Sequence, residues 1–459
     1  MSDATLLAIS PLDGRYAAKS DPLREIVSEY GLIRFRLAVE VAWLRVLVEQ
    51  DALDVSLPPE VSDRLTAITD AFTIDDARAV KEIESKTNHD VKACEYYLAE
   101  LVRQHGGDDA LIALLHFGCT SEDINNLAYA MMLKQARDQV VVPELKGIAD
   151  LLADRAREWA DTPMLSRTHG QTASPTTMGK EIANILARLD RETTTLNATG
   201  ILGKFNGAVG NYNAHTSAID DANWPEMARQ LVETVGVDYN PMTTQIEPHD
   251  WIAAYLQTIS RIATILIDFS RDCWTYISLG YFSQKTVAGE VGSSTMPHKV
   301  NPIDFENAEG NLGMVVALAN HLANKLPRSR LQRDLTDSTT LRNLGSVLGY
   351  LSIAISSLRR GIGKLEIVER ALEDDLERSW EVLAEPIQTV MRRYGVADAY
   401  DQLKALTRGK VIDRSRVGEI LDGIDLPDEA RKKLADLTPH SYVGLAAELT
   451  REYLAQRHQ

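Results

Sequence analysis

Cysteine is scarce in this chain of 459 residues. The three that occur, Cys94, Cys119 and Cys273, form an odd set without the spacing of metal ligands. The sequence therefore supports neither a framework of disulfides nor a zinc site, and it predicts no bound metal. A reducing cytoplasm is the compartment that we expect from this composition.

Long apolar runs and export signals are also missing. No run of about 18 or more apolar residues occurs. The start of the chain, MSDATLLAIS, has neither the basic segment nor the long apolar segment of a secretion signal. We expect a protein that is not exported and has no membrane partner.

Positive charge is in the minority, with 49 Lys and Arg against 66 Asp and Glu and a net charge of −17. A nucleic-acid partner would need a basic face, so none is expected. Residues 293–342 differ from the rest, because they hold six basic and five acidic residues. This stretch favours a local site for a small anionic molecule.

Glycine-rich phosphate loops are absent as well. The sequence contains neither GxxxxGK[ST] nor GxGxxG, so nothing in it predicts ATP hydrolysis or a dinucleotide cofactor. We expect chemistry that uses no cofactor.

Helical spacing of apolar residues dominates the chain, and sustained alternation of the kind seen in strands is scarce. Stripes run through 37–48, 178–189, 255–269 and 344–358, which predicts an all-α class. The segments 176–190, 251–282 and 308–324 carry apolar or small residues on more than one face. Such helices belong in a bundle or an oligomer core, although a large monomer would also bury them.

Glycines mark two candidate boundaries, at 106–107 and at 361–363, and the chain beyond the second is highly charged. We predict three domains, spanning 1–110, 111–363 and 364–459. Pro327 is expected to interrupt the helical run of 320–331.

The most informative segment is residues 292–302, GSSTMPHKVNP, which combines hydroxyls, a cation and an amide in one loop. Elimination next to a carboxylate needs a base for a carbon-bound proton, an acid for the leaving group, and donors for the carboxylate. Ser293 or Ser294 offers the base, and Lys299 and Asn301 offer the donors. The residues alone do not distinguish the two serines.

Three histidines stand in polar surroundings, namely His89, His169 and His298. His169 lies between Arg167 and Gly170 and precedes a segment that we expect to become a buried helix near Pro175. A titratable ring at such a helix entrance is a candidate acid.

Six segments, in this order, carry a resemblance to a known family: PLDGRY (11–16), SKTNHDVKACEYY (85–97), TSEDINN (120–126), SRTHGQTASPTTMGKE (166–181), the loop 292–302 and QRDLTDSTTLRN (332–343). The chain resembles the fumarase/aspartase superfamily and, within it, the adenylosuccinate lyase family. This resemblance implies a three-domain fold with a central bundle of long helices, assembled as a homotetramer with shared active sites. It also implies nucleotide substrates, with fumarate eliminated from adenylosuccinate and from succinyl-aminoimidazole-carboxamide ribotide in purine biosynthesis.

The resemblance assigns roles to residues. It implies Ser293 as the general base, His169 as the general acid and His89 as a further residue of the site. The substrate contacts that it implies are Arg15, Tyr16, Asn88, His89, Asp90, Thr120, Ser121, Gln245, Ser294, Lys299, Asn301, Asn307, Arg333, Ser338, Thr339, Thr340, Leu341 and Arg342. Gln245 is expected near the succinyl carboxylates and the arginines near the phosphate.

Other interpretations of these segments exist. PLDGRY also suits a simple turn, and TSEDINN suits a helix cap at Ser121. The chain could be another superfamily lyase, such as argininosuccinate lyase, aspartase or fumarase, or an inactive helical scaffold. The phosphate-type segments 11–16 and 332–342 favour a nucleotide substrate, and a scaffold would have no need of the loop hydroxyls or His169.

Overall fold

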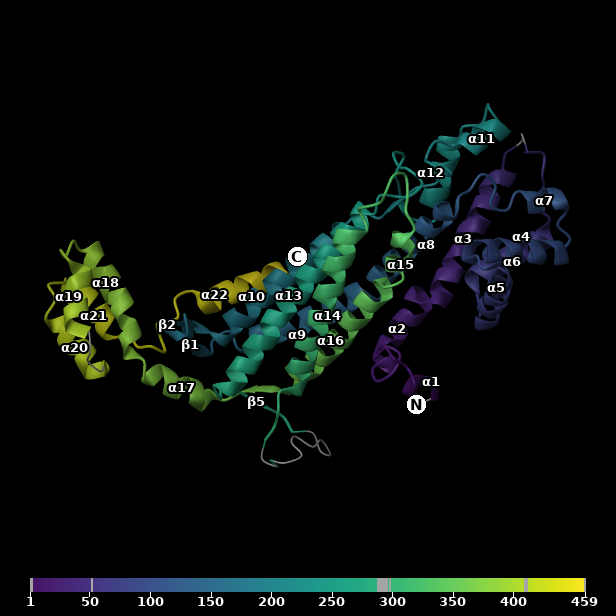
Figure 1. The fold of residues 1–459 in the computed structure, drawn as a ribbon. Helices are drawn as coiled ribbons and strands as arrows, with labels where there is room; N and C mark the ends of the chain where they lie inside the picture. Colours follow the sequence, from purple (N-terminus) through teal and green to yellow (C-terminus); the bar gives the residue numbers. More distant parts are fainter. Residues whose placement is uncertain (1–2, 51–52, 287–295, 297–298, 408–411, 458–459) are drawn as a thin grey trace. The chain divides into compact units, whose positions relative to one another are not determined.

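The structure is a computed structural model that describes residues 3–50, 53–286, 296, 299–407 and 412–457. It is built mostly from helices (Figure 1). The described chain divides into two compact units, each made of three chain segments. Unit 1 comprises residues 1–145, 192–264 and 310–356, and unit 2 comprises residues 146–191, 265–309 and 357–459. The predicted division into three domains is a different partition and stays a prediction.

Five long helices contain residues of both units: α9 (Val142–Glu158), α10 (Met178–Ala198), α13 (Asp250–Ser278), α14 (Ile303–Lys325) and α16 (Leu344–Lys364). Unit 1 also contains α1 (Asp3–Leu6), α2 (Ala17–Val27), α3 (Glu29–Val48), α4 (Pro59–Asp70), α5 (Ile74–Thr87), α6 (Asp90–Gln104), α7 (Asp109–Ala113), α8 (Ser121–Ala136), the π-helical turn η2 (Arg137–Val141), β3 (Leu202–Gly203), α11 (Asn213–Ala218), α12 (Trp224–Thr234), β4 (Asp238–Tyr239) and α15 (Thr336–Leu341). Unit 2 also contains β1 (Pro163–Thr168), β2 (Gln171–Thr177), β5 (Phe282–Gln284), β6 (Leu365–Ile367), α17 (Glu369–Glu377), the short helix η3 (Trp380–Leu383), α18 (Ala384–Arg393), α19 (Ala399–Thr407), α20 (Arg414–Asp422), α21 (Asp428–Ala435) and α22 (Ala446–Gln456).

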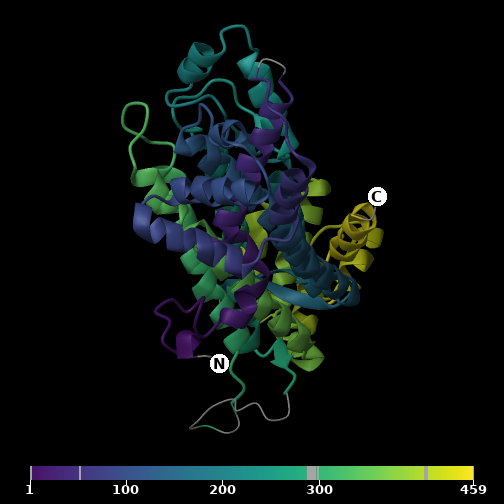
Figure 2. The ribbon, with the colours of Figure 1, turned by 90° about the vertical axis from the view of Figure 1, so that its right-hand side faces the viewer.

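Helix α3 is the centre of the N-terminal part of unit 1. The Ser28 side chain accepts a hydrogen bond from the Gly31 amide and so caps the helix. A Cβ atom at Gly31 would lie 2.2 Å from the carbonyl oxygen of Ile26, so only glycine allows the close turn from α2 into α3. Leu37, Val41 and Leu44 of the stripe predicted at 37–48 are buried, and α3 contacts α5, α6 and α8. Figures 1 and 2 show α3, α5 and α6 side by side in both views.

In unit 2, aromatic and small residues join the long helices. Phe305 of α14 meets Phe269 of α13 with ring centroids 6.2 Å apart. A Cβ atom at Gly361 of α16 would lie 2.9 Å from the Phe305 ring. Glycine at 361 therefore lets α16 pack closely against Phe305. The helix continues through 361–363 and ends at Lys364, so the glycines do not end it. Helix α14 ends at Lys325, two residues before Pro327, as predicted.

Helix α13 is the one described helix that is long and apolar enough, by length and composition, to span a membrane. However, 67% of its apolar window is buried inside the protein. A helix with this burial is a core helix, which agrees with the predicted role of 251–282 in the interior.

The structure corrects the all-α prediction in one respect, because the described residues form three two-stranded sheets besides the helices. The strands β1 and β2 form an antiparallel hairpin, β3 and β4 are parallel, and β5 and β6 are antiparallel. They lack the alternation that identifies strands, since β3 and β4 are only two residues long and β1 is apolar on neighbouring positions. The mainly helical class is confirmed.

The helices α18 to α21 of unit 2 gather around a core of their own (Figure 1). Its fully buried members include Leu383, Met391 and Leu421, and Leu165 of β1 packs into the same core. The β1–β2 hairpin is therefore anchored to this helical cluster.

Candidate active site

His169 occupies the tip of the β1–β2 hairpin, not a helix entrance as the sequence suggested. Thr168 pairs with Gln171, and the two residues between them, His169 and Gly170, have φ angles of 54° and 75°. Positive φ at both central positions is the geometry of a tight hairpin turn that matches the twist of its strands. The side chain of His169 is exposed, so its ring is available to a ligand. Helix α10 begins only at Met178, because Pro175 belongs to β2.

Arg167 pairs with Thr172 close to the tip of this hairpin and is itself held in place within unit 2. Its guanidinium donates to the Tyr281 hydroxyl at 2.7 Å and also pairs with Asp375 of α17. The Tyr281 hydroxyl donates to the same carboxylate, and burial raises the pKa of Tyr281 to about 12. The tyrosine thus remains a neutral donor at physiological pH, and the triad holds the strand that carries His169.

The candidate residues Asn88 and His89 lie at the junction of α5 and α6 in unit 1. Asn88 ends α5 in the left-handed conformation, with φ 51°, and His89 is the N-cap of α6. The His89 Nδ1 atom accepts a hydrogen bond from the Lys92 amide at 3.1 Å. Since an amide only donates, Nδ1 is unprotonated and Nε2 carries the proton of the neutral ring. This exposed ring presents an N–H donor outward.

Asp90 joins two arginines beside His89. Its carboxylate forms ion pairs with Arg36 at 2.7 Å and with Arg342 at 3.0 Å. Arg342 forms a second ion pair with Glu29 at 2.8 Å. Burial disfavours the charged carboxylate, but the charge and hydrogen bonds of Arg36, helped by Arg342, lower the pKa of Asp90. The structure thus brings together two predicted contacts, Asp90 and Arg342.

Arg342 also borders a pocket of about 290 Å³ in unit 1. Its lining residues are Leu12, Asp13, Ser20, Leu23, Arg24, Val27, Ser28, Glu29, Arg342, Gly345, Ser346 and Gly349. Arg15 is exposed and does not line it, and its guanidinium lies 5.9 Å from the Tyr16 ring. The structure therefore leaves Arg15 and Tyr16 outside the Arg342 pocket.

The segment TSEDINN starts helix α8, and its cap is Thr120, one residue before the Ser121 that the sequence suggested. The Asp123 carboxylate accepts a hydrogen bond from the Thr120 amide at 2.8 Å. This reciprocal cap orients Thr120 and Ser121 at the first turn of the helix, where the helix dipole favours a bound anion.

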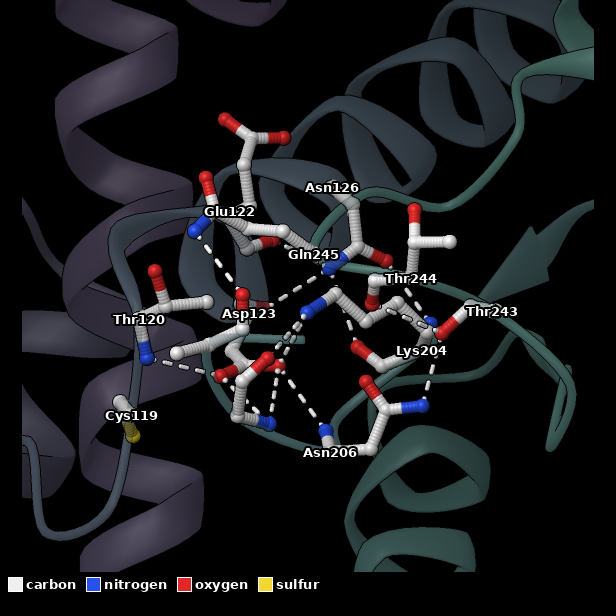
Figure 3. A network of polar contacts seen from close by, with 12 residues as sticks. Cys119, Thr120, Glu122, Asp123, Asn126, Lys204, Asn206, Thr243, Thr244 and Gln245 are labelled. Atoms are coloured by element: carbon white, nitrogen blue, oxygen red, sulfur yellow. Dashed lines mark hydrogen bonds and ion pairs between the residues drawn. The ribbon is translucent and has the colours of Figure 1, made fainter. Parts of the chain in front are cut away.

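Asp123 is the centre of a buried network (Figure 3). Its carboxylate accepts the Lys204 ammonium at 2.7 Å, the Asn206 amide at 2.9 Å and the Gly207 amide at 3.2 Å. Both charged side chains are 0% exposed. Asn126 completes the network, because its amide group bonds to the backbone of Lys204 in both directions. The network joins the start of α8 to the chain segment after β3.

The chain segment after β3 also contacts Gln245. The Gln245 amide donates to the Ala208 carbonyl at 2.9 Å, and its oxygen accepts from Arg333 at 3.4 Å. The Arg333 guanidinium also donates to Glu122 at 3.0 Å. Gln245 and Arg333, both predicted contacts, thus form one donor patch beside α8.

The remaining predicted site residues lie in α15, in or just before α14, or outside the described residues. Ser338, Thr339, Thr340 and Leu341 belong to α15, with the Leu341 side chain buried. In unit 2, Asn307 accepts from the Ser357 hydroxyl at 2.8 Å, and Lys299 is exposed. Asn301 lies just before α14. Ser293, Ser294 and His298 lie outside the described residues.

The sequence prediction missed the polar residues behind the site, above all Asp123, Lys204, Asn126 and Asp337. A lysine in the run Gly-Lys-Phe-Asn-Gly (203–207), next to apolar neighbours, was a signal that could have been used. Its partner is 81 residues away along the chain, so the sequence alone gave no reason to pair them.

Replacing Asp123 by alanine is expected to destabilise the protein by about 3–5 kcal/mol, because it leaves the buried Lys204 ammonium and several amides without their acceptor. The thermal midpoint should fall strongly, and substrate turnover should fall with it. Asp138→Ala is the matched control, since Asp138 is 44% exposed and pairs with Arg137 at 2.7 Å. Its loss should cost at most about 1 kcal/mol. Equal midpoints for the two variants would contradict the assigned role of Asp123.

Comparison with known proteins places this geometry in a class of enzymes. A family model described as "Lyase" matches residues 14–317, and one described as "Adenylosuccinate lyase C-terminal" matches residues 329–443. Crystal structures of a fumarate lyase from Mesorhizobium sp. BNC1 and of the 3-carboxy-cis,cis-muconate lactonizing enzyme from Pseudomonas putida share the fold. Each has a TM-score of 0.76 over 95% of this chain and 97% of its own, at 20% and 22% identity. The protein therefore has the fumarate lyase fold.

Curated relatives narrow the class to one family. The adenylosuccinate lyase of Vibrio cholerae is 53% identical over 98% of this chain and 99% of its own length. That of Escherichia coli is 52% identical over 98% of this chain and its full length. The chain belongs to the adenylosuccinate lyase family and is a carbon–nitrogen lyase, so the resemblance seen in its motifs is confirmed.

Proposed function

We propose that this protein eliminates fumarate from adenylosuccinate, giving AMP, and from succinyl-aminoimidazole-carboxamide ribotide in purine biosynthesis. The observation that carries the proposal is sequence identity. This chain is 53% identical to the adenylosuccinate lyase of Vibrio cholerae over nearly the whole length of both chains. Two groups of residues support it, namely the donor patch of Gln245 and Arg333 and the ion-pair group of Arg36, Arg342, Asp90 and Glu29. Each contains a guanidinium, the group that binds carboxylates and phosphates in two-point contacts.

The proposed reaction begins with proton removal. Ser293 takes the proton from the carbon next to a succinyl carboxylate, and the carbanion is held as its aci-carboxylate near Lys299 and Asn301. His169 then protonates the departing nitrogen, so that the carbon–nitrogen bond breaks and fumarate forms. The exposed ring of His169 at a tight turn supports this role, since the turn presents the ring without covering it. His89 assists by donating from Nε2 to the substrate.

We also propose that the protein is a cytoplasmic homotetramer with active sites shared between subunits. The support is a face of helix α14 in unit 1 that exposes Gly310, Gly313, Met314 and Ala317. A glycine inside a helix costs about 1 kcal/mol relative to alanine. Nothing lies within 4 Å of a Cβ atom built at either glycine, so packing inside the chain does not require them. Glycines at these two positions are suited to the close approach of a helix from another copy.

Gly313→Glu is expected to reduce the particle mass below that of a tetramer, because it places a charge on this face. Light scattering coupled to size exclusion measures the mass. Gly418→Glu is the matched control, since Gly418 also lies in a helix with open space around it. A tetrameric Gly313→Glu protein would contradict the placement of the interface, and a monomeric unmodified protein would contradict the tetramer itself.

The substrate is tested by the ultraviolet change on adding adenylosuccinate, with argininosuccinate and malate as controls. Adenylosuccinate should respond and the controls should not. Turnover of either control without turnover of adenylosuccinate would favour another lyase of the superfamily, and turnover of none would favour an inactive scaffold.

A further inference from the structure

A buried acid and a buried histidine lie directly behind Arg333 in unit 1. Asp337 Oδ2 is 3.5 Å from Arg333 Nε and 3.8 Å from His249 Nε2. The side chains of Asp337 and His249 are 3% and 2% exposed, against 14% for Arg333. The sequence motifs predicted Arg333 as a substrate contact. They assigned no role to Asp337 or His249.

The backbone holds each member of this group in place. Asp337 lies in the first turn of α15, and its Oδ1 atom accepts from the Ser338 amide at 2.7 Å. His249 precedes α13 with φ 65°. Its amide donates to Glu247 at 2.7 Å, and Glu247 in turn accepts from Asn240 at 3.0 Å. The His249 backbone and the Asp337 carboxylate are thus held by bonds that do not involve Arg333.

Three polar atoms of the group converge without a hydrogen bond among the described residues, namely His249 Nε2, Asp337 Oδ2 and Arg333 Nε. Unpaired buried polar atoms are costly, so a group of three needs a reason. The charge of Asp337 supplies one, because an ionised carboxylate attracts both neighbours. Burial opposes its ionisation, but His249 and the Arg333 guanidinium lower the pKa of Asp337.

The Nη atoms of Arg333 face Gln245, which is a predicted substrate contact, and the buried Glu122. The Nη1 atom reaches Gln245 at 3.4 Å and the Nη2 atom reaches Glu122 at 3.0 Å. Nε, which lies along the same edge of the guanidinium as Nη2, is 3.5 Å from Asp337 Oδ2. A planar guanidinium that is fixed along one edge offers its other edge in one orientation.

We propose that Asp337, oriented by His249, is a positioning residue that fixes the Arg333 guanidinium for an anionic group of the nucleotide substrate. The inference rests on the proposed function, since it takes Arg333 as a substrate contact. It adds two residues that act through Arg333 and do not touch the substrate.

Asp337→Asn tests the proposal, because asparagine keeps the acceptor for the Ser338 amide and removes the charge. A lost interaction with a charged group is worth about tenfold or more in affinity. We expect KM to rise by about that factor and kcat to change little, because Arg333 binds and does not transfer protons. Asp334→Asn is the matched control. Asp334 lies in the same segment but pairs with the exposed Arg330 at 3.7 Å, so its KM should stay near that of the unmodified protein.

His249→Asn gives a second, independent variant. Asparagine tolerates a positive φ, so the backbone before α13 is kept while the imidazole is removed. We expect a smaller rise of KM in the same direction as for Asp337→Asn. An unchanged KM in both variants, with the fold intact by circular dichroism, would overturn the proposal.

A double-mutant cycle separates positioning from a general structural role. Arg333→Lys keeps a cation beside Glu122 and loses the Nε contact, so adding Asp337→Asn to it should weaken binding little further. Additive losses would show that Asp337 does not act through Arg333 and would overturn the proposal.

The cycle is read by calorimetric binding of AMP and, separately, of fumarate. Weakened AMP binding identifies the phosphate as the anion, and weakened fumarate binding identifies the carboxylates. Both support the proposal, and unchanged binding of both overturns it. Because binding needs no turnover, the outcome is distinct from that of the substrate assay, whose failure would concern the proposed function alone.

Discussion

Replacing His169 by asparagine is expected to lower kcat by about 10²–10⁴-fold, the usual contribution of a general acid or base. The hairpin should survive, because His169 has φ 54° and precedes Gly170 with φ 75°, and Asn-Gly is the preferred pair for such a turn. Asparagine therefore removes the titratable ring and keeps the backbone. Steady-state kinetics with adenylosuccinate, alongside circular dichroism, measures both effects.

His105→Asn is the control for this substitution. His105 lies at the end of α6, where its ring contacts the Leu101 carbonyl at 2.8 Å, and it has no proposed role in turnover. Its kcat should remain close to that of the unmodified protein. A His169→Asn enzyme with near-normal kcat would exclude His169 as the acid, and another group would have to protonate the departing nitrogen.

Replacing Ser293 by alanine is expected to lower kcat by a similar factor, about 10²–10⁴-fold, because proton removal from carbon then lacks its base. Substrate binding should persist, since the donors at Gln245, Arg333 and Arg342 are untouched. Calorimetric titration with adenylosuccinate measures binding, and single-turnover kinetics measures the chemical step.

Ser294→Ala is the matched comparison for Ser293→Ala. The residues of the loop did not distinguish the two serines, and both lie outside the described residues, so only their kinetics can assign the base. We expect Ser294→Ala to retain much more activity. A reversed order of the two rates would transfer the role of base to Ser294.

The helical part of this fold was predictable because its signal is local. The stripes at 178–189, 255–269 and 344–358 repeat with the period of a helix, and the structure places them in α10, α13 and α16. The β1–β2 hairpin was missed for a physical reason. The strand β1 contacts α17, and β2 contacts η3 and α22. Both strands are exposed toward the turn, so buried and exposed residues do not alternate along them. The placement of His169 was wrong for the same reason.

The candidate site was predictable only where a motif carries it. His89, Thr120 and Arg342 stand in short segments whose order along the chain identified the family. Asp123 with Lys204 and Asp337 with His249 are pairs that the fold brings together from positions more than 80 residues apart. A single sequence contains no local pattern for such pairs, and their burial became visible only in the structure.

The central claim is that this chain cleaves the carbon–nitrogen bond of adenylosuccinate with release of fumarate. Nuclear magnetic resonance of the reaction mixture tests it most directly, because it observes both products without a coupled assay. The account predicts that adenylosuccinate disappears as AMP and fumarate appear in equal amounts, and that the Ser293→Ala and His169→Asn proteins at the same concentration produce both far more slowly. Unchanged adenylosuccinate in the presence of folded, unmodified protein would contradict it.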